Sequence, residues 1–141
     1  MNILGCLTPK SEVNYITDDA SLFKAIQTLQ DSNYSSIPII NKKGKYIGTI
    51  SAGDILGCVK ENFNLSVKDS ADFPVRNVKR IRDNKPVNGN ATMEGIVEFI
   101  LEQNFVPVVD DEENFIGIIT RKEVMKWMHS QFLKEHPEIS N

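Results

Sequence analysis

The chain has 141 residues, of which 40% are hydrophobic and 25% are charged, and its formal net charge is −3 at pH 7. This balance is typical of a soluble domain that buries its core without disulfides or a structural metal. It lacks the concentrated basic face of a nucleic-acid binder. No apolar run approaches the ~20 residues of a membrane-spanning helix, and residues 1–10 lack the basic and apolar regions of a signal peptide. We therefore expect a cytoplasmic protein that binds neither nucleic acid nor membranes.

The first half of the chain predicts a strand, a helix, a hairpin and a second helix. A short strand is expected at 15–17. The apolar residues of the next segment follow the i, i+3, i+4, i+7 spacing of an amphipathic helix: Leu22, Ala25, Ile26 and Leu29. Apolar runs at 37–40 and 46–51, separated by a turn, predict a hairpin. A helix is expected from residue 55 to 59 and beyond, and a short helix at 65–70.

The second half of the chain repeats this order. The helical stripe returns after 71 positions as Met93, Ile96, Val97 and Ile100, whereas the hairpin returns after 69 positions, at 106–109 and 115–120. A helix is expected at 124–132. We assign the two missing residues to the equivalents of Ser35 and Ser36. The strand that opens the second copy is blurred by Pro86, and we place it at 85–87.

The last helix of each copy begins with a motif that has two interpretations. Ser51 and Thr120 can cap the helix, and Asp54 and Glu123 stand three residues later, at the spacing of a capping box. A helix N-terminus also offers free amides and a partial positive charge to a phosphate. The carboxylate could then accept hydrogen bonds from a ribose. The motif is therefore either a structural cap or part of a nucleotide site.

Two pairs of segments resemble the signature of the cystathionine β-synthase (CBS) domain. The first pair is 33–40 and 47–54, and its second copy is 106–110 and 116–123. The resemblance covers about residues 8–132. It implies a Bateman module with an α/β (α+β) fold, in which two β-α-β-β-α repeats pack through their sheets about a pseudo-two-fold axis. The expected boundaries are 1–62 for repeat 1, 63–77 for a linker, 78–132 for repeat 2 and 133–141 for a loose C-terminal tail.

The resemblance also implies two clefts for adenine-containing ligands, each assembled across the pseudo-two-fold axis. The Thr120 cleft would be formed by Val13, Asn14, Tyr34, Ser35, Ser36, Ile37, Thr120, Arg121, Lys122 and Glu123. The Ser51 cleft would be formed by Ser51, Asp54, Lys85, Phe105 and Val106. We favour the Thr120 cleft because Arg121 and Lys122 would place two cations beside its helix start. The two missing residues would also shorten the other cleft.

The chain resembles small stand-alone bacterial CBS-pair proteins that bind cyclic di-AMP. This implies a regulatory protein that senses an adenine nucleotide (cyclic di-AMP, ATP, ADP or AMP), holds no other cofactor and no metal, and signals to an effector protein. A homodimer is expected, with Ile55, Met125 and Met128 as contacts. The alternative is a structural or dimerisation module without a ligand. No Ser or Cys has a nearby His to serve as a base, so we do not expect an enzyme.

Overall fold

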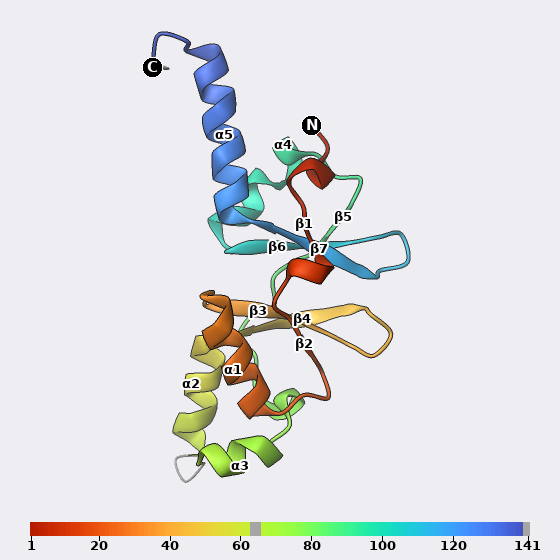
Figure 1. The fold of residues 1–141 in the computed structure, drawn as a ribbon, viewed down its shortest axis with the longest axis vertical. Helices are drawn as coiled ribbons and strands as arrows, with labels where there is room; N and C mark the ends of the chain where they lie inside the picture. Colours follow the sequence, from red (N-terminus) through yellow and green to blue (C-terminus); the bar gives the residue numbers. More distant parts are fainter. Residues whose placement is uncertain (63–65, 140–141) are drawn as a thin grey trace.

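Two small β-sheets lie against each other at the middle of an elongated molecule, and helices cover their outer faces (Figure 1). The computed structural model describes residues 1–62 and 66–139. The strand order is β2-β3-β4 in the first sheet and β1-β7-β6-β5 in the second. The predicted α/β fold of two β-α-β-β-α repeats is confirmed.

The two repeats have the same element order and the same strand pairing. The first repeat contains β2 (Ile16–Thr17), α1 (Leu22–Ser32), β3 (Ser36–Ile40), β4 (Tyr46–Ser51) and α2 (Ala52–Glu61). The second contains β5 (Val87–Asn88), α4 (Met93–Ile96), the 3-10 helix η4 (Val97–Leu101), β6 (Phe105–Val109), β7 (Phe115–Thr120) and α5 (Arg121–Glu135). In each repeat a parallel pair is followed by an antiparallel hairpin. Between the repeats lie α3 (Val67–Asp72) and the 3-10 helix η3 (Val75–Asn77).

Several elements begin or end away from their expected positions. The strand β5 excludes Lys85 and Pro86, because the Lys85 amide donates to the Gln103 side chain and proline has no amide donor. The helix α5 starts at Arg121 and runs to Glu135, so the expected tail begins as helix. The expected helix at 65–70 forms as α3, capped by Ser66. Positions 63–65 of the expected linker and 140–141 of the expected tail lie outside the described residues.

The first nine residues pack on the second repeat, although chain order assigns them to the first. The 3-10 helix η1 (Ile3–Cys6) places Ile3, fully buried, in the core of the second repeat. The strand β1 (Thr8–Pro9) then pairs antiparallel with β7. The 3-10 helix η2 (Lys10–Glu12) leads on to β2. The N-terminus therefore completes the second sheet before the chain enters the first.

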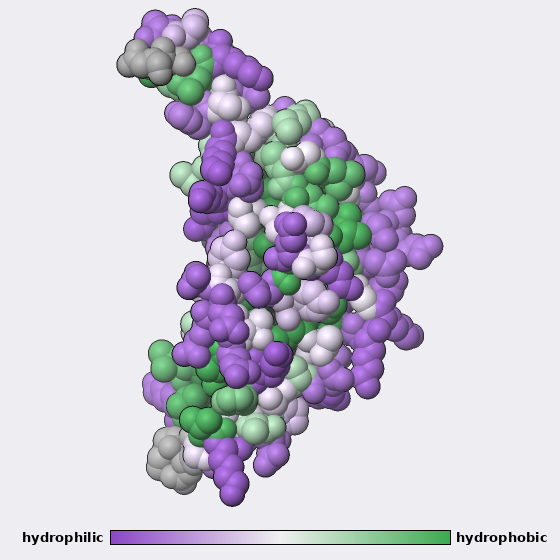
Figure 2. All heavy atoms as spheres, viewed as in Figure 1, coloured by the Kyte–Doolittle hydropathy of each residue, from purple (hydrophilic) through white to green (hydrophobic). Residues whose placement is uncertain are grey.

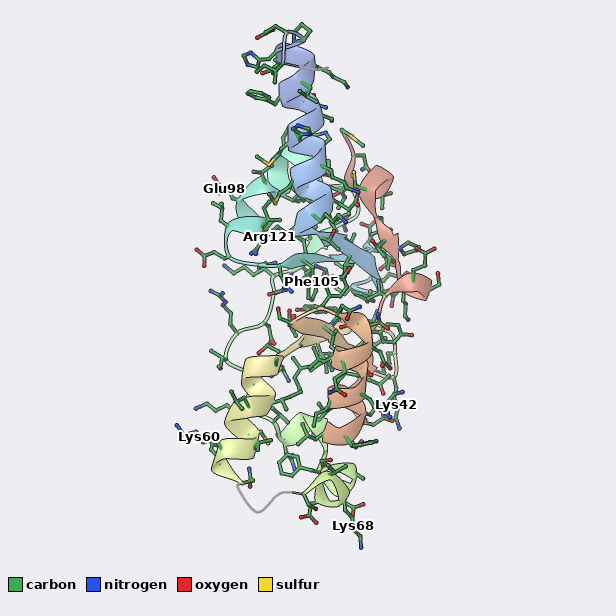
Figure 3. All side chains as sticks on the ribbon, turned by 60° about the vertical axis from the view of Figure 1, so that its left-hand side comes forward. Lys42, Lys60, Lys68, Glu98, Phe105 and Arg121 are labelled. Atoms are coloured by element: carbon green, nitrogen blue, oxygen red, sulfur yellow. The ribbon has the colours of Figure 1, made fainter. Side chains whose placement is uncertain are left out.

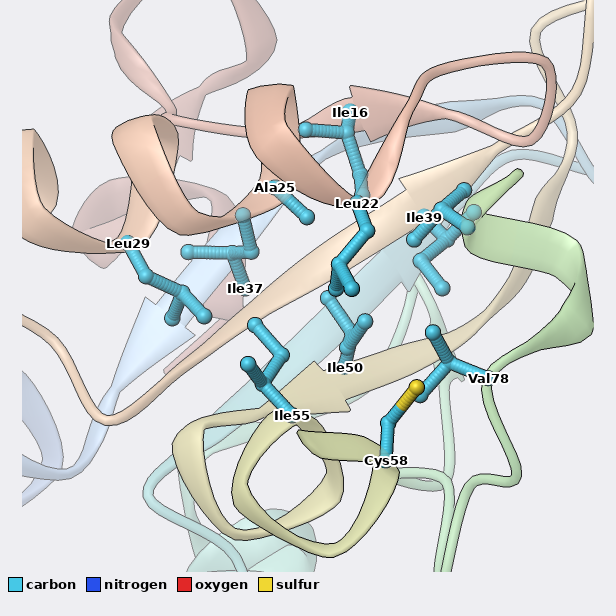
Figure 4. Packing of buried hydrophobic residues seen from close by; sticks show 11 residues of the cluster. Ile16, Leu22, Ala25, Leu29, Ile37, Ile39, Ile50, Ile55, Cys58 and Val78 are labelled. Carbon is cyan, nitrogen blue, oxygen red and sulfur yellow. The ribbon is translucent and has the colours of Figure 1, made fainter. Parts of the chain in front are cut away.

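Each repeat has its own apolar core, and a third cluster joins them. Figure 4 shows the first core, where α1 and α2 pack on β3 and β4 through residues such as Leu22, Ile37 and Ile50. The third cluster lies between the sheets and contains Ile40, Phe105, Phe115 and Ile118. Tyr15 and Tyr46 pack on Phe115 with ring centroids 6.2 Å and 6.4 Å away. The repeats therefore pack through their sheets, as expected.

The two residues missing from the second repeat come from the end of a helix. Ser36 pairs with Ser51 and Phe105 pairs with Thr120, so Asn104 and Phe105 occupy the register of Ser35 and Ser36. The expectation that this pair is lost is therefore wrong. The helix α1 has 11 residues, whereas α4 and η4 have 4 and 5. A 3-10 helix rises ~2.0 Å per residue against ~1.5 Å in an α-helix, so the shorter segment spans nearly the same length.

No helix within the described residues is long and apolar enough to cross a membrane. The longest, α5, has 15 residues and projects beyond the second repeat (Figure 1). Lys, His and Glu side chains are spread along it, and only Val124 is buried. Its outer half therefore has little contact with the remainder of the chain.

Candidate functional site

Two hollows lie where the repeats meet, one at the start of each C-terminal helix. The Thr120 cleft has a volume of about 30 Å³, and the Ser51 cleft has a volume of about 560 Å³. Ser36 and Asn104 line both clefts. Thus the strand entrances of both repeats contribute to each cleft.

The Thr120 cleft is a narrow and mostly apolar slot. It is lined by Thr8, Glu12, Val13, Asn14, Tyr34, Ser36, Ile37, Pro38, Asn104, Phe105, Ile118 and Thr120. The structure therefore brings together six of the residues expected there: Val13, Asn14, Tyr34, Ser36, Ile37 and Thr120. At about 30 Å³ the slot is far below the roughly 300–1,000 Å³ of typical ligand pockets. The slot must widen before it can take a nucleobase.

The remaining residues expected in the Thr120 cleft lie elsewhere. Ser35 and Arg121 line the Ser51 cleft, and Arg121 is labelled in Figure 3. The Arg121 Nε donates to the Ile100 carbonyl at 2.9 Å. Lys122 is exposed and lines neither cleft, while a Glu123 carboxylate oxygen lies 3.8 Å from the Lys126 Nζ. Successive residues of a helix point about 100° apart, so neighbours at a helix start cannot all face one cleft. The two cations expected in the Thr120 cleft are therefore not among the residues that line it.

The Ser51 cleft is open and polar, and its lining differs in part from the expected set. It is lined by Ser35, Ser36, Thr49, Ser51, Ala52, Gly53, Asp54, Ile81, Arg82, Asn84, Glu102, Asn104 and Arg121. Of the expected residues, Ser51 and Asp54 are present. Lys85, Phe105 and Val106 are not among the lining residues, because Phe105 packs between the sheets and Val106 lies in the second core.

Sequence reasoning missed Thr49, Ile81, Arg82, Asn84 and Glu102 in this cleft. One signal was available for Asn84. The shift of 71 positions that relates the two helical stripes also relates Val13 to Asn84, and Val13 was expected in the other cleft. The charged residues Arg82 and Glu102 carry no such signal.

The Ser51 cleft combines two arginines with the start of α2. Arg82 comes from the loop before β5, and Arg121 comes from α5. Arg82 pairs with Glu102 at 3.4 Å, but both side chains are mostly exposed, so this pair is weak and screened by water. At the start of α2, the Ala52 amide donates to the Ser35 carbonyl and the Asp54 amide donates to the Ser51 hydroxyl. Among the described residues the intervening Gly53 amide has no hydrogen-bond acceptor, and it is suited to an anion.

Asp54 forms a fixed wall of this cleft. Its side chain is 3% exposed, its Oδ2 accepts from the Ser51 amide at 3.0 Å, and its Oδ1 accepts from the Ile81 amide at 2.9 Å. The first bond completes a capping box with Ser51. The second ties the loop before β5 to α2. Both oxygens of the carboxylate therefore already bind backbone amides of the protein.

The loop 79–84, which forms the far wall, is held on β4 mainly by side chains. The Asp83 Oδ1 accepts from the Thr49 amide at 2.9 Å and from the Arg80 Nε at 2.8 Å. The Tyr46 hydroxyl donates to the Asn84 carbonyl at 2.6 Å. Burial raises the pKa of Tyr46 above its ordinary value, so this hydroxyl stays protonated and keeps donating. These contacts fix the loop that presents Arg82 to the cleft.

Two tandem β-α-β-β-α repeats, with a cleft at the start of each C-terminal helix, define a paired-repeat module. The model of the CBS domain family matches residues 5–61 and 72–130, so this chain belongs to the CBS domain family and carries two tandem copies. The resemblance inferred from the sequence is confirmed.

The chain is similar to solved structures of stand-alone CBS-pair proteins. One is CbpB in complex with c-di-AMP, which is 29% identical with a TM-score of 0.81, over 98% of this chain and 91% of that one. Another is Listeria monocytogenes CbpB in complex with c-di-AMP, which is 25% identical with a TM-score of 0.77, over 92% of this chain and 96% of that one.

Curated relatives come from the archaeon Methanocaldococcus jannaschii. The uncharacterized protein MJ1426 is 27% identical, over 79% of this chain and 83% of the relative. Three further relatives from this organism are longer, and this chain spans less than half of their length.

Proposed function

We propose that this protein is a non-catalytic sensor that binds an adenine nucleotide in the Ser51 cleft and signals its presence to a partner protein. One observation carries the proposal. The Ser51 cleft has a volume of about 560 Å³ and places Arg82, Arg121 and the free amide of Gly53 around one space. This set of donors suits a phosphate group, because charged donors and a helix N-terminus both favour an anion.

The neutral parts of a nucleotide find polar partners in the same cleft. Asn84 and Asn104 carry amide side chains, and Ser35 and Ser36 carry hydroxyls. These groups can both donate and accept hydrogen bonds, as a base and a ribose require. The choice of adenine rests on the CbpB structures, which hold c-di-AMP.

A ligand in the Ser51 cleft would connect the two repeats. Gly53 belongs to α2 of the first repeat, whereas Arg121 belongs to α5 of the second. A ligand that contacts both Gly53 and Arg121 favours the conformation in which the two repeats hold these residues around one cleft. It therefore increases the population of that conformation. The projecting helix α5 would carry that shift to a partner protein.

The proposal includes a homodimer formed through α2 and α5. Large apolar side chains are exposed on both helices: Leu56, Val59, Met125, Met128 and Phe132. Figure 2 shows hydrophobic residues gathered over the part of the surface where α1 and α2 lie. Ile55, which we expected at the contact, is instead 9% exposed and belongs to the first core. A second copy that covers these helices would remove this apolar surface from water.

The Thr120 cleft is the second candidate site. Val13, Asn14, Tyr34, Ile37 and Thr120 line it, but its volume of about 30 Å³ is far smaller than that of the Ser51 cleft. A ligand there would have to separate the two sheets, at a cost in the buried contacts of Phe105 and Ile118. The Ser51 cleft needs no such opening.

Isothermal titration calorimetry with AMP, ATP, S-adenosylmethionine, cyclic di-AMP and GMP tests the proposal. We expect saturable binding of one or more adenine nucleotides and weaker binding of GMP. At 100 times its Kd, the ligand should raise the free energy of unfolding by about 2.7 kcal/mol, and the melting temperature should rise accordingly. Adenosine should bind more weakly than AMP because it lacks the phosphate. If none of them binds at millimolar concentration, the alternative of a structural or dimerisation module is supported instead.

A further inference from the structure

The last helices of the two repeats, α2 and α5, present equivalent apolar stripes to solvent. Leu56 and Val59 are exposed on α2. Met125 and Met128 are exposed on α5. The shift of 69 positions that relates the two hairpins also relates the first pair to the second. Residues three apart lie on one face of a helix, so each pair forms one patch. The two repeats therefore carry equivalent contact surfaces.

Both helices lie on the same side of the elongated molecule, near its two ends. In Figure 1, α2 lies in the lower part and α5 in the upper part, and both are to the left of the sheets. A second copy related by a two-fold axis can cover both stripes in two ways. Either each helix meets its own counterpart, α2 on α2 and α5 on α5, or α2 of one copy meets α5 of the other.

The charges of the two helices distinguish these arrangements. Helix α5 carries four basic side chains and two acidic ones: Arg121, Lys122, Lys126, Lys134, Glu123 and Glu135. Helix α2 carries one basic side chain and two acidic ones: Lys60, Asp54 and Glu61. Packed helices lie about 8–10 Å apart, within the ~10 Å over which exposed charges interact at 0.1 M salt. Two copies of α5 would therefore repel each other, whereas α5 and α2 have net charges of opposite sign and attract each other.

Helix α5 requires a partner more than α2 does. Phe132 continues its stripe by another turn and is exposed, while Val124 is the one buried residue of this 15-residue helix. An isolated helix of about this length is marginal in water. Packing another helix on the stripe would remove its apolar side chains from water and stabilise the outer half of α5.

We infer that α5 of a second copy packs on α2, and that α2 of that copy packs on α5, in a two-fold dimer. The inference rests on the proposed homodimer and specifies its orientation. Two-fold symmetry forms the contact twice, so both stripes are covered. Because α2 begins at the Ser51 cleft, each cleft then has α5 of the other copy on one of its helices. The helix that responds to a ligand in one chain thus belongs to both chains.

A charge exchange at the equivalent positions Leu56 and Met125 tests this orientation. Leu56→Lys and Met125→Glu each place an unpaired charge in an apolar contact, so each single variant should be monomeric at micromolar concentration. In the double variant, both contacts pair the introduced lysine of one copy with the introduced glutamate of the other. We expect it to dimerise at least tenfold more tightly than either single variant, a change of about 1.4 kcal/mol, and to weaken as salt is raised.

The matched control is the double variant Leu56→Glu/Met125→Glu, whose introduced charges repel in either arrangement, so it should stay monomeric. Sedimentation equilibrium measures each Kd, and circular dichroism checks that every variant is folded. If the lysine–glutamate double variant dimerises no better than the single variants, the inference is overturned, because pairing like helices places lysine against lysine. Single variants that dimerise like the wild type would overturn it too. A monomeric wild type would instead refute the proposed homodimer itself, and nucleotide binding is measured independently of both.

Discussion

The Ser36 hydroxyl donates a 2.9 Å hydrogen bond to the Asn104 Oδ1, and these two residues line both clefts. Ser36 opens β3 and Asn104 precedes β6, so the bond joins the strand entrances of the two repeats. The Asn84 side chain also donates to the Asn104 Oδ1, at 3.4 Å. A ligand in the Ser51 cleft would therefore contact residues that also line the Thr120 cleft.

The first prediction concerns this hydrogen bond. Ser36→Ala removes the donor at a site that is 8% exposed, and we expect the free energy of unfolding to fall by about 1 kcal/mol. Urea denaturation measures this loss. Ser35→Ala is the matched control, because Ser35 is exposed and its hydroxyl has no hydrogen-bond partner among the described residues. Equal stability of the two variants would show that the bond contributes nothing.

The second prediction separates the two cations at the start of α5. Arg121 lines the Ser51 cleft and Lys122 lines neither cleft, so Arg121→Ala should weaken AMP binding about tenfold or more while Lys122→Ala changes it little. Calorimetry at one fixed salt concentration gives both affinities. Circular dichroism checks the helix, since the Arg121 Nε also binds the Ile100 carbonyl. A larger loss with Lys122→Ala would contradict this assignment of the phosphate site.

The fold could be predicted because its signals are local and occur twice. The stripes that begin at Leu22 and Met93 bury the same positions, and the first strand of each hairpin is an apolar run that contains a proline. Ser51 and Thr120 cap their helices as the spacing predicts. The position of the missing pair could not be predicted in this way. Asn33-Tyr34 and Asn104-Phe105 look alike in sequence, but only the strand register shows that Phe105 corresponds to Ser36.

The lining of the clefts was less predictable, because it depends on side-chain direction and on contacts distant in sequence. The sequence places Thr120, Arg121 and Lys122 together, yet the turn of the helix points them to different sides. The loop 79–84 is not a strand. Asp83 and Asn84 hold it in place by hydrogen bonds to Thr49 of β4, which lies more than 30 positions away in the sequence. Such pairs leave no periodic signal in a single sequence.

The third prediction tests the proposed dimer. Leu56 is 71% exposed on α2 and Met125 is 57% exposed on α5. Placing a charge at either position would leave it buried in an apolar interface, at a cost of several kcal/mol, so Leu56→Glu and Met125→Glu should give monomers. Light scattering at micromolar concentration measures the mass. Val67→Glu on α3 is equally exposed in the wild type and should stay dimeric. A monomeric wild type would refute the dimer.

The last prediction compares Asp54 with Glu123, which occupy equivalent positions in α2 and α5. Asp54 accepts from the amides of Ser51 and Ile81, so Asp54→Ala leaves two amides without an acceptor and removes half of a capping box. We expect a loss of about 2 kcal/mol in the free energy of unfolding. The Glu123 carboxylate instead lies 3.8 Å from an exposed lysine, Lys126, so Glu123→Ala should cost no more than about 0.5 kcal/mol. Urea denaturation of both variants gives the comparison, and equal losses would show that the buried carboxylate of Asp54 has no special part in holding the loop 79–84 to α2.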